Sequence, residues 1–370
     1  MKITALDVPG YEKVMRADDP QVGLKAFIAV HDTTLGPALG GMRFWPYASE
    51  QDAMTDVLRL AEGMTYKSAV AETGLGGGKS VVVADPRMKK SPALLHAMGK
   101  FINELGGKYI TAEDVGCTVE DLLVVAEETK FVTGLPRERG GSGDPSPFTA
   151  LGVYTGLKAA AEVTYHNDNL AGKTVAVQGS GHVGYWLCKH LFEAGARLYV
   201  TDVRPERTER VKKEFKAVVV ELDDIFDVAC DIFAPCALGG ILNDTTIPRL
   251  RCKIVGGAAN NQLLESRHAD ALQARGILYA PDYVINAGGI INIGLELDPK
   301  GYDECRALER IKHIGAVLKD VFTTATANRI STDKAAKEVA LRKLRDAKLR
   351  TDAASSVGAG AKARDKSKAR

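Results

Sequence analysis

The chain is too long to be organised around one hydrophobic core, because at 370 residues it exceeds the size at which a single core usually stops growing. Hydrophobic residues at 45% and charged residues at 26% are typical of a globular protein, and a formal net charge of +2 favours neither a nucleic-acid nor a membrane partner. No apolar run has the length of a signal-peptide core or a membrane span, and the six cysteines show no metal-ligand spacing. We therefore expect a two-domain cytoplasmic protein with reduced thiols and no metal.

The first 135 residues mix expected strands and helices, joined by segments rich in glycine. Ser49 and Asp52 have the spacing of a helix capping pair, and apolar residues then recur at helical spacing as far as Lys67. This pattern predicts an α/β domain. The expected elements, in order, are a strand at 25–31, turns at 32–43, a helix from 49 to about 67, a glycine-crowded turn at 73–80 followed by a strand at 81–83, a helix at 93–105, and a strand that begins at 109 and runs into a loop by 116.

The composition shifts to Gly, Pro, Arg and Ser between residues 134 and 146, as it does where a chain crosses between domains. Beyond this segment, short β-rich apolar runs alternate with helical segments, which is the pattern of a parallel, doubly wound sheet. The expected strands are 173–178, 197–202, 217–220, 231–235, 253–257 and 276–280, and the expected helices include 149–164, a segment ending at 193 and the region 305–347.

A dinucleotide site is predicted where the strand at 173–178 ends in Gly179-Ser-Gly181-His-Val-Gly184 and a helix follows. The first glycine permits the tight turn, the second lets the backbone approach a pyrophosphate, and the third allows the helix to pack closely on the strand. The next strand ends at Asp202, whose carboxylate suits the ribose hydroxyls of NAD and repels the 2′-phosphate of NADP. Arg204 keeps NADP open as the alternative. A glycine turn used only for packing is disfavoured, because strand, glycines, helix and acid all coincide.

Two lysines and an aspartate in the first domain are candidates for the chemistry. Lys67 falls late in its expected helix, where an ammonium suits the helix dipole and could hold a substrate carboxylate. Lys79 lies among glycines beside an apolar strand, and partial burial would lower its pKa and make it a usable general base. Asp114, in the loop after a strand, could be its acid/base partner. Taken alone, each lysine is more typical of a solvated surface group, and the residue chemistry by itself does not decide the assignment.

The segment Gly78-Lys79-Ser80 also resembles the end of a phosphate-binding P-loop. That motif needs a glycine where this chain has Thr73, and it must open a helix, whereas a valine-rich strand follows here. A nucleotide-triphosphatase function is therefore disfavoured.

Long glycine- and lysine-rich segments of the chain resemble the Glu/Leu/Phe/Val dehydrogenase family, from about residue 10 to about residue 340. The resemblance is greatest to its leucine-type members. The segments are LGGMRFWPY (39–47), GMTYKSAVAETGLGGGKSVV (63–82), TAEDVGCTVEDL (111–122), PSPFTALGVYTGLKAA (145–160), VQGSGHVG (177–184), DIFAPCALGGILN (231–243), GGAANNQL (256–263) and APDYVINAGGIINI (280–293).

The resemblance assigns roles to individual residues. Lys67 matches the lysine that binds the substrate α-carboxylate, Lys79 the catalytic lysine, and Asp114 the aspartate that shuttles protons to and from the amino nitrogen. Gly40 and Gly41 match backbone that flanks the substrate carboxylate. Residues near the cofactor are matched by Thr133, Thr149 and Asn261, in addition to Gly179, Gly181, Gly184 and Asp202.

The implied reaction is the NAD-dependent oxidative deamination of an L-amino acid to its 2-keto acid and ammonia. Hydride leaves the substrate Cα in a cleft that closes on it, Lys79 activates a water that attacks the resulting iminium, and Asp114 protonates the departing ammonia. Loss of Lys79 or Asp114 would instead suggest a catalytically silent NAD-binding regulator, but both are present.

The side-chain pocket of the family is matched by four aliphatic residues, so a branched-chain substrate is expected and glutamate is not, because its carboxylate would be buried without a partner. Ala112 matches the leucine-type members, whereas relatives that act on aromatic amino acids tend to have glycine there. Leucine, valine and isoleucine differ by too little to be well separated. The alternatives are a phenylalanine or tryptophan dehydrogenase, and plain core residues that happen to align. The four residues are Leu39, Ala112, Ile290 and Ile293.

The expected fold is thus α/β with two domains and a cleft between them. Residues 1–135 form a substrate-binding and oligomerisation domain, to which a helix at about 331–350 returns, and residues 136–330 form a Rossmann-type NAD domain. From Leu341 to the C-terminus ten lysines and arginines face three aspartates, so 351–370 is expected to be a disordered basic tail rather than an electrostatic docking segment. Relatives assemble as dimers or octamers, so a homo-oligomer is expected.

Overall fold

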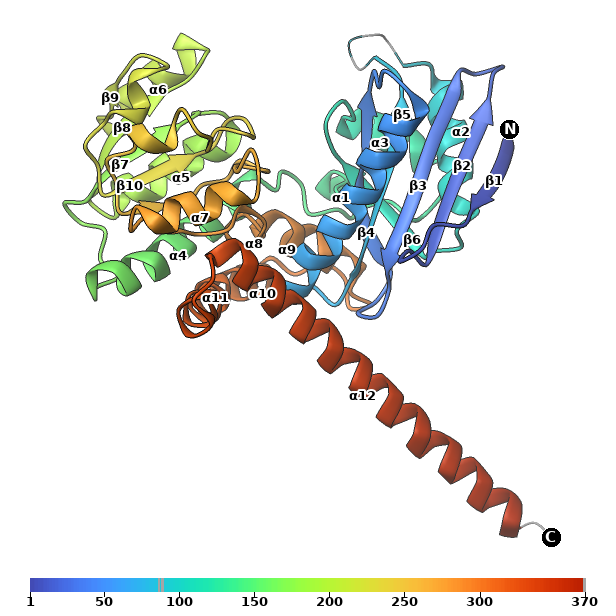
Figure 1. Cartoon of the computed structure of the whole chain (residues 1–370). Helices are drawn as coiled ribbons and strands as arrows, with labels where there is room; N and C mark the ends of the chain where they lie inside the picture. The colour runs from blue at the N-terminus through green and yellow to red at the C-terminus, as the bar shows by residue number, and fades with distance from the viewer. Residues whose placement is uncertain (86, 88–89, 369–370) are drawn as a thin grey trace. The chain divides into compact units, whose positions relative to one another are not determined.

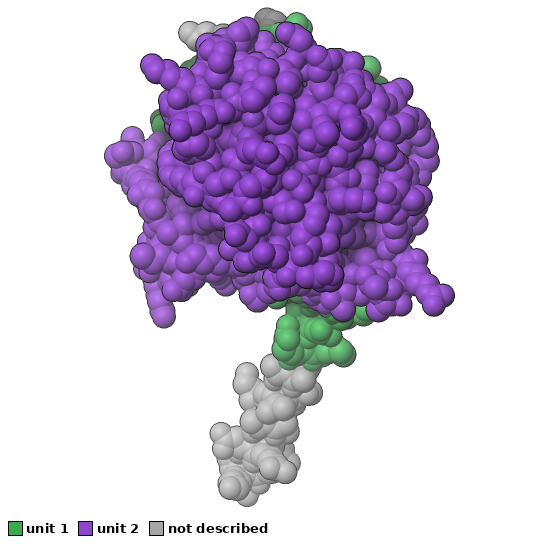
Figure 2. All heavy atoms as spheres, turned by 90° about the vertical axis from the view of Figure 1, so that its left-hand side faces the viewer, with its two compact units in different colours: residues 1–132, 338–370 green, residues 133–337 purple. Residues whose placement is uncertain are grey.

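The computed structural model describes the backbone of residues 1–85, 87 and 90–368, and the side chains of these residues up to 350. The chain forms two compact units (Figures 1 and 2). Unit 1 comprises Met1–Val132 and Glu338–Arg370, and unit 2 comprises Thr133–Lys337. Each unit contains one six-stranded sheet.

The sheet of unit 1 is mixed and has the strand order β1-β2-β3-β5-β4-β6. The three strands β5, β4 and β6 run parallel to one another, and the remaining neighbours pair antiparallel. The elements of this unit before residue 133 are β1 (Lys2–Leu6), β2 (Lys13–Asp19), β3 (Leu24–Asp32), β4 (Ala38–Trp45), α1 (Glu50–Val70), β5 (Gly76–Val83), α2 (Pro92–Asn103), β6 (Tyr109–Glu113) and α3 (Val119–Val125).

Helix α1 begins where the capping pair predicts. The backbone N–H of Asp52 donates to the Ser49 side chain at 3.1 Å, which satisfies one of the free N–H groups of the first turn. The apolar face of the helix, which includes Ala53 and Val57, packs with Phe27 and Val81 of the sheet. This packing fixes the helix that carries Lys67 against the strand that carries Lys79.

Two segments predicted as glycine-rich turns are strands, so those predictions were wrong. The turn expected at 32–43 contains most of β4, and the turn expected at 73–80 contains the first half of β5. The physical reason is close packing between neighbours: a Cβ on Gly40 would lie 1.8 Å from the Gly78 carbonyl oxygen, and one on Gly77 would lie 2.1 Å from the Thr65 backbone nitrogen. Glycine is required here by lack of space and not by a turn.

The sheet of unit 2 is parallel throughout and has the order β9-β8-β7-β10-β11-β12, which is the 3-2-1-4-5-6 order of a Rossmann-type doubly wound sheet. The predicted fold class is confirmed. The elements are α4 (Ser146–Tyr165), β7 (Thr174–Gln178), α5 (His182–Glu193), β8 (Arg197–Thr201), α6 (Pro205–Phe215), β9 (Val218–Val219), β10 (Ile232–Pro235), β11 (Ile254–Val255), α7 (Arg267–Ala274), β12 (Leu278–Tyr279), α8 (Asp282–Ile285), α9 (Gly288–Gly294), α10 (Glu304–Lys312) and α11 (Ile314–Asn328).

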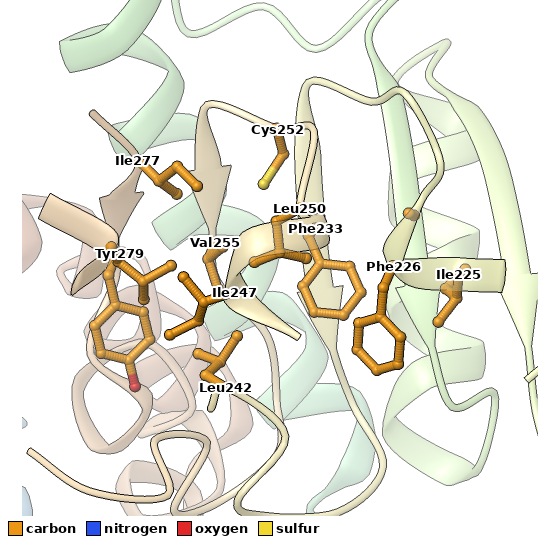
Figure 3. Packing of buried hydrophobic residues seen from close by; sticks show 12 residues of the cluster. Ile225, Phe226, Phe233, Leu242, Ile247, Leu250, Cys252, Val255, Ile277 and Tyr279 are labelled. Atoms are coloured by element: carbon orange, nitrogen blue, oxygen red, sulfur yellow. The ribbon is translucent and has the colours of Figure 1, made fainter. Parts of the chain in front are cut away.

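A cluster of buried apolar side chains fills one part of unit 2 (Figure 3). Phe233 of β10, Val255 of β11 and Tyr279 of β12 contribute from adjacent strands, and Phe226 packs against Phe233 with ring centroids 5.7 Å apart. Because this cluster packs three adjacent strands against one another, the loops that follow these strands start from fixed positions.

The last helix, α12 (Thr332–Lys368), includes residues of both units. In unit 1, the Lys343 ammonium contacts the Glu72 carboxylate at 2.7 Å. The basic tail predicted at 351–370 falls where side chains lie outside the described residues. Among the helices that are described, none is both long enough and apolar enough to cross a membrane.

Candidate active site

Lys79 and Asp114 form a buried ion pair in unit 1. Lys79 lies in the middle of β5, and Asp114 is the first residue after β6. The Lys79 ammonium is 2.6 Å from a carboxylate oxygen of Asp114, with side-chain exposures of 7% and 19%. The structure therefore brings together the two residues that the sequence nominates for proton transfer.

Burial and the neighbouring opposite charge shift the pKa of each member of this pair in opposite directions. Burial lowers the pKa of Lys79, and although the neighbouring Asp114 carboxylate opposes this effect, the pKa remains below its usual value. For Asp114, burial favours the neutral form, but the charges of Lys79 and Arg43 outweigh it and lower the pKa to about 2. Asp114 is thus held as a carboxylate beside an amine whose pKa is lowered, which is a suitable arrangement for moving protons.

Arg43 is a member of this site that sequence reasoning missed. Its Nε donates to Asp114 Oδ2 at 3.0 Å, the same oxygen that Lys79 contacts, and its Nη1 donates to Asp56 Oδ2 at 3.0 Å. Asp56, on α1, also accepts the Tyr47 hydroxyl at 2.6 Å. No local signal identifies Arg43 in the sequence, because the segment 32–43 is predicted there as turns and both of its partners are distant in the chain.

The backbone of β4 passes directly beside this pair. Gly40 packs against β5 as described above, and a Cβ on Gly41 would lie 2.5 Å from the Glu113 carbonyl oxygen and 2.6 Å from the Asp114 Cβ. Gly41 pairs with Ala112 in the sheet register. The predicted carboxylate-flanking glycines therefore lie within β4, beside Ala112 of β6 and next to the ion pair, and Leu39 is fully buried one residue before Gly40.

Lys67 occupies the last turn of α1 and is half-buried. Two residues earlier, Thr65 packs on Gly77 of β5, which places the end of α1 over the strand that carries Lys79. A lysine in the last turn is also where the helix dipole favours a cation.

The glycine loop after β7 has the close contacts of a dinucleotide site. Gly179 has a φ of +94°, which favours glycine, and a Cβ on Gly184 would lie 2.0 Å from the Gly179 carbonyl oxygen. At Gly181, by contrast, the protein atoms that a Cβ would meet belong to the Arg207 guanidinium, 3.3 Å away. Glycine at that position keeps open a space that the described protein atoms do not fill, as a pyrophosphate requires.

Donors around this loop also fit a dinucleotide. Helix α5 begins at His182, and its N-cap residue Gly181 provides no side-chain cap, so the first N–H groups of the helix are available to phosphate oxygens. The Ser180 hydroxyl is buried and has no hydrogen-bond partner within the described structure. A buried hydroxyl without a protein partner fits a site that takes a polar ligand.

Asp202 lies beside the same loop and is nearly buried. Its carboxylate accepts the backbone N–H of Ser180 at 2.8 Å and that of Arg204 at 2.9 Å. The Arg207 guanidinium is 3.8 Å from one carboxylate oxygen. Arg204 caps α6 through its backbone, so the cation nearest Asp202 in these contacts is Arg207, which sequence reasoning did not identify.

The other predicted residues of unit 2 lie on or near α4 and α9. Thr149, on α4, donates its hydroxyl to the Pro145 carbonyl at 3.1 Å, and a Cβ on Gly289 would lie 2.7 Å from that hydroxyl. Helix α9 is therefore pressed against Thr149 next to Ile290, while Ile293 is one turn further along α9. Thr133 is buried at the start of unit 2, and Asn261 is an exposed residue with a φ of +52°.

The described residues contain no group of three or more His, Cys, Asp or Glu side chains that could hold a metal ion. The six cysteines are unpaired.

Comparisons with known proteins match nearly the whole chain to one family. A family model described as Glu/Leu/Phe/Val dehydrogenase, dimerisation domain, matches residues 11–131, and the Glutamate/Leucine/Phenylalanine/Valine dehydrogenase model matches 140–203 and 200–351. Leucine dehydrogenase of Thermoactinomyces intermedius is 55% identical over 330 residues, covering 89% of this chain and 90% of that protein. Phenylalanine dehydrogenase of Caldalkalibacillus thermarum is 47% identical, covering 91% and 92%.

Among solved structures, L-tryptophan dehydrogenase from Nostoc punctiforme superimposes with a TM-score of 0.83 at 45% identity, covering 92% of this chain and 97% of that chain. The sheet orders, the buried lysine–aspartate pair and the glycine loop are thus accompanied by matches to both family models and by close relatives over almost the entire sequence. The chain belongs to the Glu/Leu/Phe/Val dehydrogenase family.

Proposed function

We propose that the protein catalyses the reversible, NAD-dependent oxidative deamination of a branched-chain aliphatic L-amino acid to the 2-keto acid and ammonia. The observation that carries this proposal is the buried Lys79–Asp114 pair, at 2.6 Å, in a family member whose relatives at 52–55% identity are named leucine dehydrogenases. A family member that had lost either residue would lack the means to move protons at the amino nitrogen.

The roles of the unit 1 residues follow from their environments. The Lys67 ammonium pairs with the substrate carboxylate, beside the backbone of Gly40 and Gly41, and so fixes the substrate's orientation. Lys79 removes a proton from the water that attacks the iminium carbon, because its lowered pKa makes the neutral amine accessible. Asp114, ionised in the resting protein, takes a proton from the amino nitrogen and returns it as ammonia leaves.

The unit 2 residues fit NAD as the cofactor. Gly179, Gly181 and Gly184 with the start of α5 would hold the pyrophosphate, and Asp202 would accept the adenosine-ribose hydroxyls. Thr133, Thr149 and Asn261 are assigned to the nicotinamide end by resemblance. When bound, NAD supplies the acceptor for the hydride that leaves the substrate Cα.

Substrate choice is assigned to the aliphatic residues Leu39, Ala112, Ile290 and Ile293. None of them can pair with a charged substrate side chain, so glutamate is disfavoured. An aromatic substrate is the second candidate, because phenylalanine and L-tryptophan dehydrogenases are 46–47% identical to this chain. The leucine-type relatives are closer, and Ala112 leaves less room for a ring than glycine would.

We further propose that unit 1 is the substrate-binding and oligomerisation domain of a cytoplasmic homo-oligomer, and that unit 2 is the NAD domain. Support for assembly comes from the dimerisation-domain model that matches residues 11–131. Size-exclusion chromatography with light scattering tests this assignment, and a monomer at micromolar concentration would contradict it.

The function is tested by following NADH formation by the purified protein at alkaline pH. Leucine, valine, isoleucine, phenylalanine, tryptophan and glutamate are compared, and the best substrate is repeated with NADP. The highest kcat/KM on a branched-chain substrate with NAD is expected. Lys79→Ala should keep NADH affinity and lose turnover by roughly three powers of ten or more. Unchanged turnover in this variant would refute the mechanism, and an aromatic preference would overturn the substrate assignment.

A further inference from the structure

Arg43 lies on β4, the neighbour of the strand that carries Lys79, and contacts the Asp114 member of the proton-transfer pair. Its guanidinium and the Lys79 ammonium both contact Oδ2 of Asp114, at 3.0 and 2.6 Å. The Arg43 side chain is 18% exposed, so its charge acts across a poorly solvated region. Two cations on one carboxylate oxygen are costly to bury, and their presence calls for an explanation.

Arg43 is itself held in place from a third element. Its Nη1 contacts Asp56 of α1 at 3.0 Å, and Asp56 accepts the Tyr47 hydroxyl at 2.6 Å. The charges therefore alternate in sign from Lys79 through Asp114 and Arg43 to Asp56, and each group restrains the next. The guanidinium is the member that bonds both carboxylates, which a lysine ammonium cannot do with the same fixed geometry.

We propose that Arg43 is a positioning residue that keeps Asp114 ionised and favours the neutral, proton-accepting form of Lys79. This inference rests on the function proposed above. Arg43 does not need to touch the substrate, because it acts through the carboxylate that it shares with Lys79.

Electrostatics supports this role in two ways. Burial lowers the pKa of Lys79 and Asp114 raises it, and the positive charge of Arg43 adds a smaller lowering effect to that of burial. It also stabilises the carboxylate form of Asp114. Without Arg43, Asp114 would keep its contact with Lys79 but lose its second cationic partner, and Lys79 would lose a repulsive neighbour, so both pKa values would rise. Other titratable or charged groups on the surrounding elements are Tyr47, Asp56, Arg59, Lys67, Tyr109, Glu113 and Cys117.

The test compares Arg43→Gln, Arg43→Lys and a matched control, Arg59→Gln. Arg59 contacts Asp56 at 2.8 Å but is 63% exposed, and the cations that contact Asp114 among the described residues are Arg43 and Lys79, so this control removes the same charge from the edge of the network. The pH dependence of kcat and kcat/KM for the best amino acid is measured for each protein. Circular dichroism and NADH-binding fluorescence verify that each variant is folded.

In Arg43→Gln we expect kcat to fall by roughly ten- to hundred-fold, with KM changed by less than about three-fold. The limb of the profile that rises with pH should move to higher pH by roughly half a unit or more, because Lys79 holds its proton longer. Arg43→Lys should return the limb to the wild-type position and recover only part of kcat, since charge is restored but the double contact is not. Arg59→Gln should match the wild type.

A second readout does not require dehydrogenase activity. Acetylation of Lys79 by a small anhydride, quantified by peptide mass spectrometry between about pH 6 and pH 11, follows the neutral amine directly. Its midpoint should move to higher pH in Arg43→Gln and not in Arg59→Gln. If the wild type deaminates no amino acid, the proposed function fails while this labelling still tests Arg43. An unshifted midpoint and rate profile in Arg43→Gln, or equal shifts in Arg43→Gln and Arg43→Lys, would overturn the proposal.

Discussion

Replacing Asp114 by asparagine should lower the stability of unit 1 in a pH-dependent way. The charges of Lys79 and Arg43 lower the pKa of Asp114 from 3.8 to about 2. Each pH unit of such a shift corresponds to about 1.36 kcal/mol, so the ionised carboxylate stabilises the folded state by about 2 kcal/mol relative to its neutral form. Asparagine resembles the neutral form in shape and removes this contribution.

The pH dependence has a definite sign. A depressed carboxylate pKa stabilises the folded protein above the pKa of the unfolded chain, and this stability is lost as the pH falls through the folded value. The difference in unfolding free energy between the wild type and Asp114→Asn should therefore be largest above about pH 5 and shrink towards about pH 2. Urea unfolding at a fixed protein concentration, repeated at several pH values, measures it.

Asp7→Asn is the control, because it removes the same charge from an exposed position directly after β1 of unit 1. It should change the unfolding free energy by less than about 0.5 kcal/mol. An Asp114→Asn variant that is as stable as the wild type at neutral pH would refute the reasoning, as would a difference that does not narrow in acid. Equal stability would mean that the burial cost of the pair cancels its attraction, and a difference that persists in acid would mean that the stabilisation does not come from the ionised carboxylate.

Three further substitutions test other parts of the structure. Gly184→Ala places a Cβ 2.0 Å from the Gly179 carbonyl, so NADH binding and the melting temperature should both fall; wild-type values would show that α5 tolerates a wider approach. Glu296→Ala removes the acceptor of two Ser142 hydrogen bonds, at 2.8 and 2.5 Å, and should cost about 1–3 kcal/mol in urea unfolding; Glu296→Gln should cost less, and equal losses would contradict this. Ala112→Gly should raise the ratio of the phenylalanine kcat/KM to the leucine kcat/KM by about ten-fold. A ratio equal to or below that of the wild type would show that Ala112 does not line the substrate pocket.

The strand, glycine loop and helix at 174–193 could be predicted from the sequence because their signals are local. A strand, three glycines at fixed spacing, a helix start and an acid at the next strand end all lie between Thr174 and Asp202, and each has a direct structural reason. The parallel sheet of unit 2 followed from the same alternation. The start of α1 at Ser49 was also a local signal.

The strands β4 and β5 could not be predicted, because their glycines are required by neighbours far away in the sequence. Gly40 and Gly78 lie 38 positions apart, and each reads locally as a turn residue. Arg43 was missed for the same reason. Its partners Asp56 and Asp114 come from a helix and a strand end that only the folded sheet brings together.

The close approach of β4 and β5 has a consequence for redesign of this enzyme. The floor beside the ion pair is main chain at Gly40 and Gly41, and neither position has room for even a methyl group. Side-chain substitutions at these two glycines are therefore not tolerated. Ile290 and Ile293, by contrast, belong to helix α9 of unit 2, which has its own core. On the proposed assignment of Ile290 and Ile293 to the substrate pocket, libraries that vary α9 would alter the substrate range while the charge network of unit 1, from Lys79 to Asp56, keeps all of its contacts.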